Sequence, residues 1–464
     1  MILLAAIAAC FTGWSADYTR YYNNVPIKMA QVDPFTFPAT EVNLASLGAK
    51  PDGTTLCTDI LQKAIDDLAT QGGGRLVVPA GIWLTGPIEL RSNIDLHLER
   101  NAILYFSPDK SLYKEEDPKQ KRVKPCITAT RCTNIGITGH GTIDGNGNQW
   151  RPVKVDKFAK WELSEIKKIG GVMRSNGSLW YPWDVKSGHP NVAETPEKQE
   201  KMRNDLFRVF HCKNILIEGV TIQNSPKFHV HPFNSENVVI DGVTVRCPWN
   251  AQNGDAIDIS DCHRVLIVNS VVDCGDDGLC MKSGSPKKGI NGCEDILIRD
   301  NTVYHAHGGF VIGSESICGM KRIVVSDCTF SGTDIGLRFK SAIGRGGKCE
   351  DIYISNIMMA DIKDSAIHFE CDYADRPAGS TEAAALKAEE VKFMPEFCDI
   401  HISGVVCEKA EVGISASGVD GLRCVYDVTV DNSTIIYTAE PEKIDKATAE
   451  IKLAGVRFVP VSEL

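Results

Sequence analysis

A short pattern of polar and apolar positions recurs along the chain. Each copy starts with one polar residue, continues with β-branched or other apolar residues at alternate positions, and ends in a turn. The copies start at residues 134, 214, 237, 264, 295, 322, 351, 399 and 427. Between 214 and 351 successive starts are 23, 27, 31, 27 and 29 residues apart. A repeat of this length indicates a solenoid with one supersecondary unit per repeat.

Alternation with a period of two predicts β-strands, and the glycine and asparagine residues between copies predict turns. No helical periodicity lies between these copies, and each repeat is too short for a crossover helix. We therefore predict an all-β fold in which residues 43–464 form a single-domain right-handed parallel β-helix, with one repeat per coil.

One helix is expected before the first coils. Residues 47–81 have the pattern of a loop, a helix, a glycine turn and a strand, and Leu61, Ala64, Ile65 and Leu68 share one face of that helix. We expect this helix to cap the N-terminal end of the solenoid and cover its exposed strand edge.

The chain begins with an apolar run of about a dozen residues, too short to span a bilayer. We interpret residues 1–16 as a signal peptide and residues 17–42 as an N-terminal arm. This predicts export to the periplasm or the extracellular space without a membrane span. Cys10 lies in a context that resembles a lipoprotein cleavage site, so lipid anchoring there is one alternative, and a buried N-terminal segment is another.

The 17 cysteines of the chain favour a core role over disulfides. Five of them lie two residues before a repeat start, so equivalent positions on successive coils would hold a small buriable side chain: Cys132, Cys212, Cys262, Cys293 and Cys349. The odd total leaves at least one thiol unpaired, and no spacing of cysteine and histidine suggests zinc. We expect neither a metal ion nor an organic cofactor.

Composition and charge narrow the class of partner. The chain is 43% hydrophobic and 24% charged, as in a soluble folded protein, and its formal net charge is −10. This charge argues against nucleic acid as the main partner. Two segments, 145–205 and 371–398, interrupt the repeat, and we expect them to wall a binding site.

Candidate chemistry follows the coil spacing. Asp255, the pair Asp276 and Asp277, His307 and Arg338 follow one another at intervals of 21, 31 and 31 residues. Each of these residues alone has an ordinary explanation in turn formation or surface charge. Their coincidence at one-coil spacing predicts that they line one face as a single column.

Three close carboxylates cannot all ionise cheaply, so the pKa of one of them is raised and an acid stands beside a base. Cleavage of a glycosidic bond requires this division of labour. Arg338 and Lys340 alternate by two and so face the same way, where they could hold a carboxylate of the substrate. The expected partner is therefore an acidic polysaccharide or oligosaccharide.

At these residues the sequence resembles the polygalacturonase-type enzymes of glycoside hydrolase family 28, which are β-helix hydrolases of pectin. The four motifs that carry the resemblance occur in order: NGD at 253–255, GDD at 275–277, HGG at 307–309 and RFK at 338–340. The resemblance extends from about Val42 to about Tyr373.

The resemblance implies roles for individual residues. Asp276 would be the general acid, Asp255 and Asp277 would orient and deprotonate the attacking water, and the anomeric configuration would invert. His307 would tune the protonation of the acid. Four residues would contact the galacturonate substrate: Asn253, Arg338, Lys340 and Tyr373.

Departures from the family pattern leave the reaction type intact. Gly254 and Ala306 replace residues that the family has in its motifs, but the charged residues are retained. The acidic pair with His307 favours galacturonan over a rhamnogalacturonan backbone, and the two interrupting segments favour exo action. A rhamnogalacturonan-directed hydrolase, a calcium-dependent pectate lyase and a non-catalytic carbohydrate-binding β-helix remain as alternatives.

Overall fold

The computed structural model describes residues 17–113, 115–117, 122–183, 195–284, 290, 292–373, 392–419 and 421–463. The predicted signal peptide, with Cys10, lies outside the described residues. Of the predicted excursion at 371–398, residues 371–373 and 392–398 are described.

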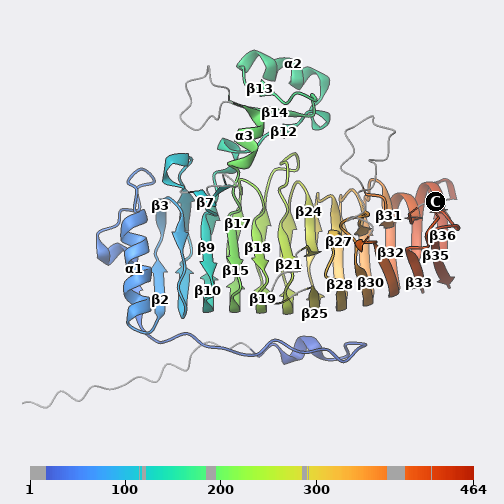
Figure 1. Ribbon diagram of the computed structural model, residues 1–464, viewed down its shortest axis with the longest axis horizontal. Coiled ribbons are helices and arrows are strands. Elements are labelled where there is room, and N and C mark those ends of the chain that lie inside the picture. Colours follow the sequence, from blue (N-terminus) through green and yellow to red (C-terminus); the bar gives the residue numbers. More distant parts are fainter. Residues whose placement is uncertain are drawn as a thin grey trace, which may run out of the picture.

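The described chain forms a long solenoid in which parallel strands stack coil upon coil (Figure 1). Each strand pairs in parallel with the equivalent strand one coil earlier and one coil later, which confirms the predicted parallel β-helix. The pairings define three stacks of strands that run along the solenoid.

The first stack comprises β1 (Glu41–Asn43), β2 (Gly74–Val78), β5 (Ile94–Leu98), β10 (Thr133–Gly139), β16 (Lys213–Glu218), β19 (Glu236–Asp241), β22 (His263–Val268), β25 (Cys293–Arg299), β28 (Met320–Ser331), β30 (Lys348–Ala360), β32 (Glu396–Ser417), β33 (Val425–Asp431) and β35 (Ala449–Ala454). The second comprises β3 (Gly81–Thr85), β6 (Ala102–Phe106), β11 (Thr142–Asp144), β17 (Thr221–Gln223), β20 (Thr244–Arg246), β23 (Val271–Asp273), β26 (Thr302–Tyr304), β34 (Thr434–Ile444) and β36 (Arg457–Pro460). The third comprises β4 (Ile88–Glu89), β9 (Ile127–Thr130), β15 (Phe207–Phe210), β18 (Val230–Phe233), β21 (Ile257–Ser260), β24 (Asp277–Ser283), β27 (Gly308–Ser316), β29 (Leu337–Lys340) and β31 (Ser365–Glu370). The long strands β28, β30 and β32 continue from the first stack into the second, and β32 and β34 also reach the third.

The polar residue that starts each repeat bends the chain into the first stack. At these positions the backbone has a positive φ, for example 55° at Asn134 and 60° at Asn214 and Asn237, which asparagine tolerates better than most residues. The amide side chains also form a ladder: Asn134 donates to Asn93 at 2.8 Å, Asn214 to Asn134 at 2.7 Å and Asn237 to Asn214 at 2.7 Å. The repeated polar residue is therefore a turn residue that also links neighbouring coils.

Apolar residues at alternate positions point into the solenoid and form one continuous core. The predicted cysteine ladder is confirmed as part of this core. In coil order the register produces one interior column of Cys132, Cys212, Ser235, Cys262, Cys293, Met320 and Cys349. All the cysteines among the described residues are free thiols.

The N-terminal cap is also confirmed. Helix α1 (Thr58–Thr70) buries Leu61, Ala64, Ile65 and Leu68, the residues that share one face. It lies at the N-terminal end of the solenoid, beside β2 (Figure 1).

The arm before the cap runs along the outside of the first stack (Figure 1). Tyr21, Tyr22 and Val32 of the arm are buried against outward-facing apolar residues of the stack, among them Leu266 and Leu297. These contacts form a second apolar cluster outside the solenoid. The arm therefore covers a sheet face that would otherwise expose apolar side chains to water.

The first interrupting segment forms a small unit above the coils (Figure 1). It contains a three-stranded antiparallel sheet of β12 (Val153–Lys154), β14 (Leu179–Tyr181) and β13 (Val172–Met173), with helices α2 (Lys160–Ile169) and α3 (Pro196–Lys201). A separate two-stranded sheet, β7 (Glu115–Asp117) with β8 (Arg122–Val123), precedes it. Among the described residues, no helix combines the length and apolarity that crossing a membrane requires.

Candidate active site

A groove of about 580 Å³ lies on the outer face of the third stack. It is lined by the eight residues predicted for the site, which are Asn253, Asp255, Asp276, Asp277, His307, Arg338, Lys340 and Tyr373. All eight residues that were selected from the sequence therefore line one cavity. The groove is also lined by Lys154, Phe228, Gln252, Lys282, Ser314, Glu315 and Arg345.

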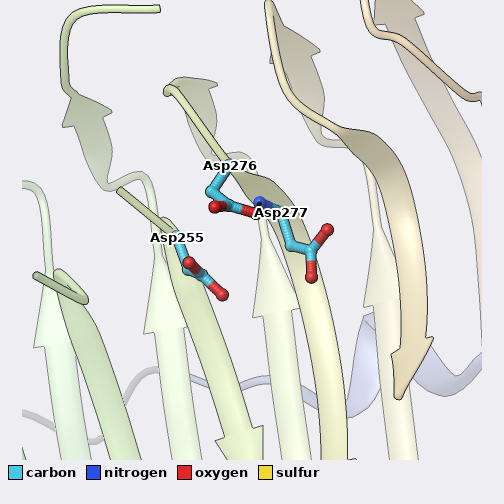
Figure 2. A group of neighbouring side chains, drawn as sticks. All are labelled: Asp255, Asp276 and Asp277. Atoms are coloured by element: carbon cyan, nitrogen blue, oxygen red, sulfur yellow. Dashed lines mark hydrogen bonds between the residues drawn. The ribbon is translucent and has the colours of Figure 1, made fainter. Parts of the chain in front are cut away.

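Strand register brings the three acids together. Asp277 is the first residue of β24, and Asp255 lies two residues before Ile257, which pairs with Leu279 of the next coil. Asp255 and Asp277 are therefore opposite one another on neighbouring coils, and Asp276 is adjacent to both (Figure 2). One oxygen from each of the three carboxyl groups lies within 4.8 Å of the others.

The prediction of a single column was wrong for Arg338. Asp277 pairs with Gly308, so His307 lies opposite Asp276 as expected, but Arg338 pairs with Val311, which is four residues beyond His307. Coil spacing gives the coil on which a residue lies but not its position along the strand. Arg338 reaches the acids through the length of its side chain, with Nη1 3.8 Å from Asp277 Oδ1.

One buried and two half-buried cations surround Asp277. Lys340 Nζ donates to Asp277 Oδ2 at 2.7 Å, and the Lys340 side chain is itself buried. Burial acts to raise the pKa of Asp277, but Lys340, Lys282 and Arg338 outweigh it and hold that pKa well below its usual range. Asp277 is therefore a carboxylate, and Lys340, expected as a substrate contact, is bonded to it here.

Lys282, which the sequence analysis did not select, is a further cation beside the acids. Its Nζ lies 3.1 Å from Asp258 Oδ1, 3.4 Å from Asp255 Oδ2 and 3.9 Å from Asp277 Oδ2. Asp258 is fully buried beneath the groove. One ammonium group thus faces three carboxyl groups.

The crowding of the acids acts most clearly on Asp255. Burial raises the pKa of Asp255 well above its usual range, and the neighbouring Asp258, Asp276 and Asp277 raise it further, against the opposing effect of Lys282. Ionisation is therefore disfavoured at Asp255 and favoured at Asp277.

His307 is fixed by two partners. Its Nδ1 is hydrogen-bonded to Asp334 Oδ2, and its Nε2 lies 2.9 Å from Lys154 Nζ. The same Nζ is 4.0 Å from Asp276 Oδ2. An ammonium group can only donate, so Nε2 accepts and Nδ1 carries the proton that is donated to Asp334.

The remaining predicted residues border the acids. Asn253 donates its backbone N–H to Asp276 Oδ2 at 3.2 Å, and its side-chain oxygen accepts from Arg203 at 2.9 Å. The ring of Tyr373 faces Lys340 and Arg338, with its centroid 5.2 Å from Lys340 Nζ and 5.6 Å from Arg338 Cζ. Tyr373 therefore lies on the cationic side of the groove.

The residues of the site that the sequence analysis did not select differ in how clearly the sequence pattern indicated them. Lys282 alternates with the inward-facing Leu279 and Met281, so period two already placed it on the outer face, and Asp258 alternates in the same way. Lys154 gave no such signal because it belongs to the interrupting segment.

The groove on this parallel β-helix combines clustered carboxyl groups with cations. These features define a class of enzyme that cleaves glycosidic bonds by acid–base catalysis. The chain belongs to the glycosyl hydrolases family 28, whose family model matches residues 158–451.

Relatives agree with this family. The chain is 27% identical to a probable polygalacturonase of Vitis vinifera, over 92% of this chain and 81% of the relative. It is 26% identical to an exo-poly-alpha-D-galacturonosidase of Dickeya chrysanthemi, over 91% of this chain and 69% of the relative. Among solved structures, the exopolygalacturonase of Thermotoga maritima is similar with a TM-score of 0.75 and 27% identity, covering 95% of each chain.

Proposed function

We propose that the protein is a polygalacturonase that hydrolyses α-1,4-galacturonosyl linkages. The observation that carries the proposal is the group of three carboxyl groups within 4.8 Å of one another, in a groove that also contains Arg338, Lys340 and Lys282. The acids match glycosidic bond cleavage, and the cations match an anionic sugar.

In the proposed mechanism Asp276 protonates the leaving oxygen. Its side chain is 14% exposed, against 4% for Asp255 and 2% for Asp277, so it is the most accessible of the three acids to a bound sugar. Asp277, kept ionised by its cations, accepts the proton of the attacking water. Asp255 holds that water through its own proton, which the raised pKa retains.

We further propose that the enzyme is exo-acting and releases single galacturonates. The interrupting segment at 145–205 supports this, because its Lys154 and Lys157 lie over the turns that contain the acids and so close the groove at that side. The similarity to enzymes described as exo-acting also supports it.

Defined oligogalacturonates test the reaction and its mode together. Mass analysis of early products should show monogalacturonate and a substrate one residue shorter, whereas a ladder of mid-sized products would contradict exo action. A rhamnogalacturonan oligomer in parallel should stay intact, and its cleavage would favour the rhamnogalacturonan-directed alternative. Asp276→Asn should lower turnover about 10²–10⁴-fold while trigalacturonate still binds.

The stereochemical outcome is a separate part of the proposal. Inverting glycosidases usually hold their two carboxyl groups about 6.5–9.5 Å apart, and retaining ones about 5–5.5 Å apart. The bound of 4.8 Å applies to single oxygen atoms and not to whole carboxyl groups, so inversion is proposed from the family resemblance. ¹H NMR of the first-formed product decides, since inversion of an α-linkage yields the β-anomer.

A lyase reaction is the alternative that shares this scaffold. The three carboxyl groups are close enough to ligate a metal ion, but Lys340 and Lys282 already supply positive charge to them. Digestion should therefore proceed in chelator without a rise in absorbance at 235 nm, which would report an unsaturated product.

Export completes the proposal. A galacturonan polymer too large to enter cells requires an enzyme in the periplasm or outside the cell, and the apolar start of the chain supports this. Fractionation of cells that express the full chain would test it, and retention in the cytoplasm would contradict it.

A further inference from the structure

The interrupting segment is attached to both turns that contain the acids. Val153 forms a backbone bridge with Ala251, shortly before Asp255 in the chain. Lys157 Nζ donates to the carbonyl oxygen of Trp249 at 2.7 Å and to that of Gly275 at 3.3 Å. The backbone holds Lys154 in place, because Lys154 pairs with Leu179 in the small sheet and the adjacent Val153 bridges to Ala251.

Lys154 extends from this segment into the groove. Its Nζ is 2.9 Å from His307 Nε2 and 4.0 Å from Asp276 Oδ2, and it lines the same cavity as the acids. The side chain is 22% exposed.

The charge of Lys154 is compensated less than that of the other lysines in the groove. Lys340 is bonded to Asp277 at 2.7 Å, and Lys282 has carboxyl oxygens at 3.1 and 3.4 Å. The close partner of Lys154 is instead an imidazole nitrogen that accepts a hydrogen bond, and its nearest described carboxylate is at 4.0 Å. Its ammonium group can therefore take up a further anionic partner from the groove.

We propose that Lys154 binds the carboxylate of a galacturonate at the cut bond and is a specificity-determining residue for acidic over esterified sugars. This inference rests on the proposed function. A charge-assisted hydrogen bond to a carboxylate is formed by the acid and lost in its methyl ester, which has no charge. The nearby His307 keeps the ammonium directed into the groove.

The test compares trigalacturonate with its methyl ester in the full-length protein. For wild type and Lys154→Met, kcat/KM is measured on trigalacturonate. Dissociation constants for both ligands are measured by calorimetry on the same two proteins with Asp276→Asn added, so that the bound ligand is not turned over during the measurement. A hydrogen bond to a charged group contributes about 1.5–3 kcal/mol. Lys154→Met should therefore weaken binding of the acid at least tenfold, leave binding of the ester within twofold, and lower kcat/KM through KM. Lys154→Arg, which keeps the charge, should retain part of the preference for the acid.

Lys157→Met is the matched control, because Lys157 comes from the same segment but bonds to backbone oxygens. It should leave the ratio of acid to ester affinity unchanged. A Lys154→Met protein that keeps the wild-type ratio overturns the inference. Equal losses for acid and ester in both variants would also overturn it, since they would indicate a purely structural segment. If wild type binds the acid in preference to the ester but cleaves neither, the proposed function fails while the binding inference is still tested.

Discussion

Replacing Lys282 by methionine should destabilise the protein far more than replacing its buried partner Asp258 by asparagine. The Lys282 ammonium faces Asp258, Asp255 and Asp277 at 3.1, 3.4 and 3.9 Å. With an effective dielectric constant of about 20, an ion pair at the shortest distance is worth about 5 kcal/mol before desolvation is counted. Removing one partner of a buried pair typically costs about 3–5 kcal/mol, and we expect that cost for Lys282→Met.

Asp258→Asn acts differently because Lys282 keeps two other carboxyl groups. It also removes a negative charge that raises the pKa of Asp255. Its cost should be no more than about 1–2 kcal/mol, close to that of losing an ordinary hydrogen bond. In the double variant the uncompensated charge left by Lys282→Met is partly removed, so the double variant should be more stable than Lys282→Met alone.

Equilibrium unfolding in urea measures these differences, with refolding checked for reversibility. The coupling free energy from the double-mutant cycle should favour the pair by about 2 kcal/mol or more. Two outcomes would refute the reasoning: additive effects of the two substitutions, or a Lys282→Met protein no less stable than Asp258→Asn.

Two further predictions concern the same site. The pKa of Asp255 is raised in the folded protein, so ionisation of Asp255 opposes folding once the pH rises above its pKa in the unfolded chain, which is near 4. Asp255→Asn should therefore raise the melting temperature at pH 7. The difference from wild type should disappear near pH 3.5. The pKa of Asp277 is lowered in the folded protein, so its ionised form stabilises the fold above the pKa of the unfolded chain, and this stabilisation is lost as the pH falls. Asp277→Asn should therefore lower the melting temperature at pH 7, and the difference from wild type should shrink toward pH 3.5. Melting curves with equal shifts at both pH values would contradict both signs. Asp334→Asn should remove the acceptor that fixes the Nδ1–H tautomer of His307, which ¹⁵N NMR of the imidazole reports, and an unchanged tautomer would show that another group fixes it.

The solenoid could be predicted from the sequence because its signal is repeated. The alternation in each repeat shows which residues face the core, and the polar residue at each start identifies a turn, as the positive φ of Asn214 and Asn237 bears out. The helix that caps the first coil followed from one apolar face. One copy of the pattern would not have distinguished a solenoid from another β fold, whereas nine copies in sequence order did.

The site could be predicted only as far as the repeat extends. Spacing by one coil predicted that Asp255, Asp277 and His307 lie near one another, as they do in the structure, but it could not show that Arg338 lies opposite Val311, four residues beyond His307. It also could not anticipate Lys154, because contacts made by an irregular segment depend on its tertiary path. The pairing of Lys340 with Asp277 likewise needed side-chain geometry, since alternation places Lys340 on the outer face but gives Asp277 the same phase as the inward-facing Leu279.

The arm outside the first stack has a consequence for how the solenoid comes apart. In a repeat protein each coil contacts only its neighbours, so unfolding can start at one end and proceed coil by coil. Here the arm crosses several coils: the N–H of Asp33 is bonded to Asn237 at 2.7 Å, the N–H of Ala30 to Asp295 at 3.0 Å, and Tyr21 accepts from Asn269 at 2.6 Å. The arm thus links the coils that carry the acids, so we expect these coils to unfold together. Slow hydrogen exchange should therefore be shared across these coils, while the coils beyond the reach of the arm fray independently.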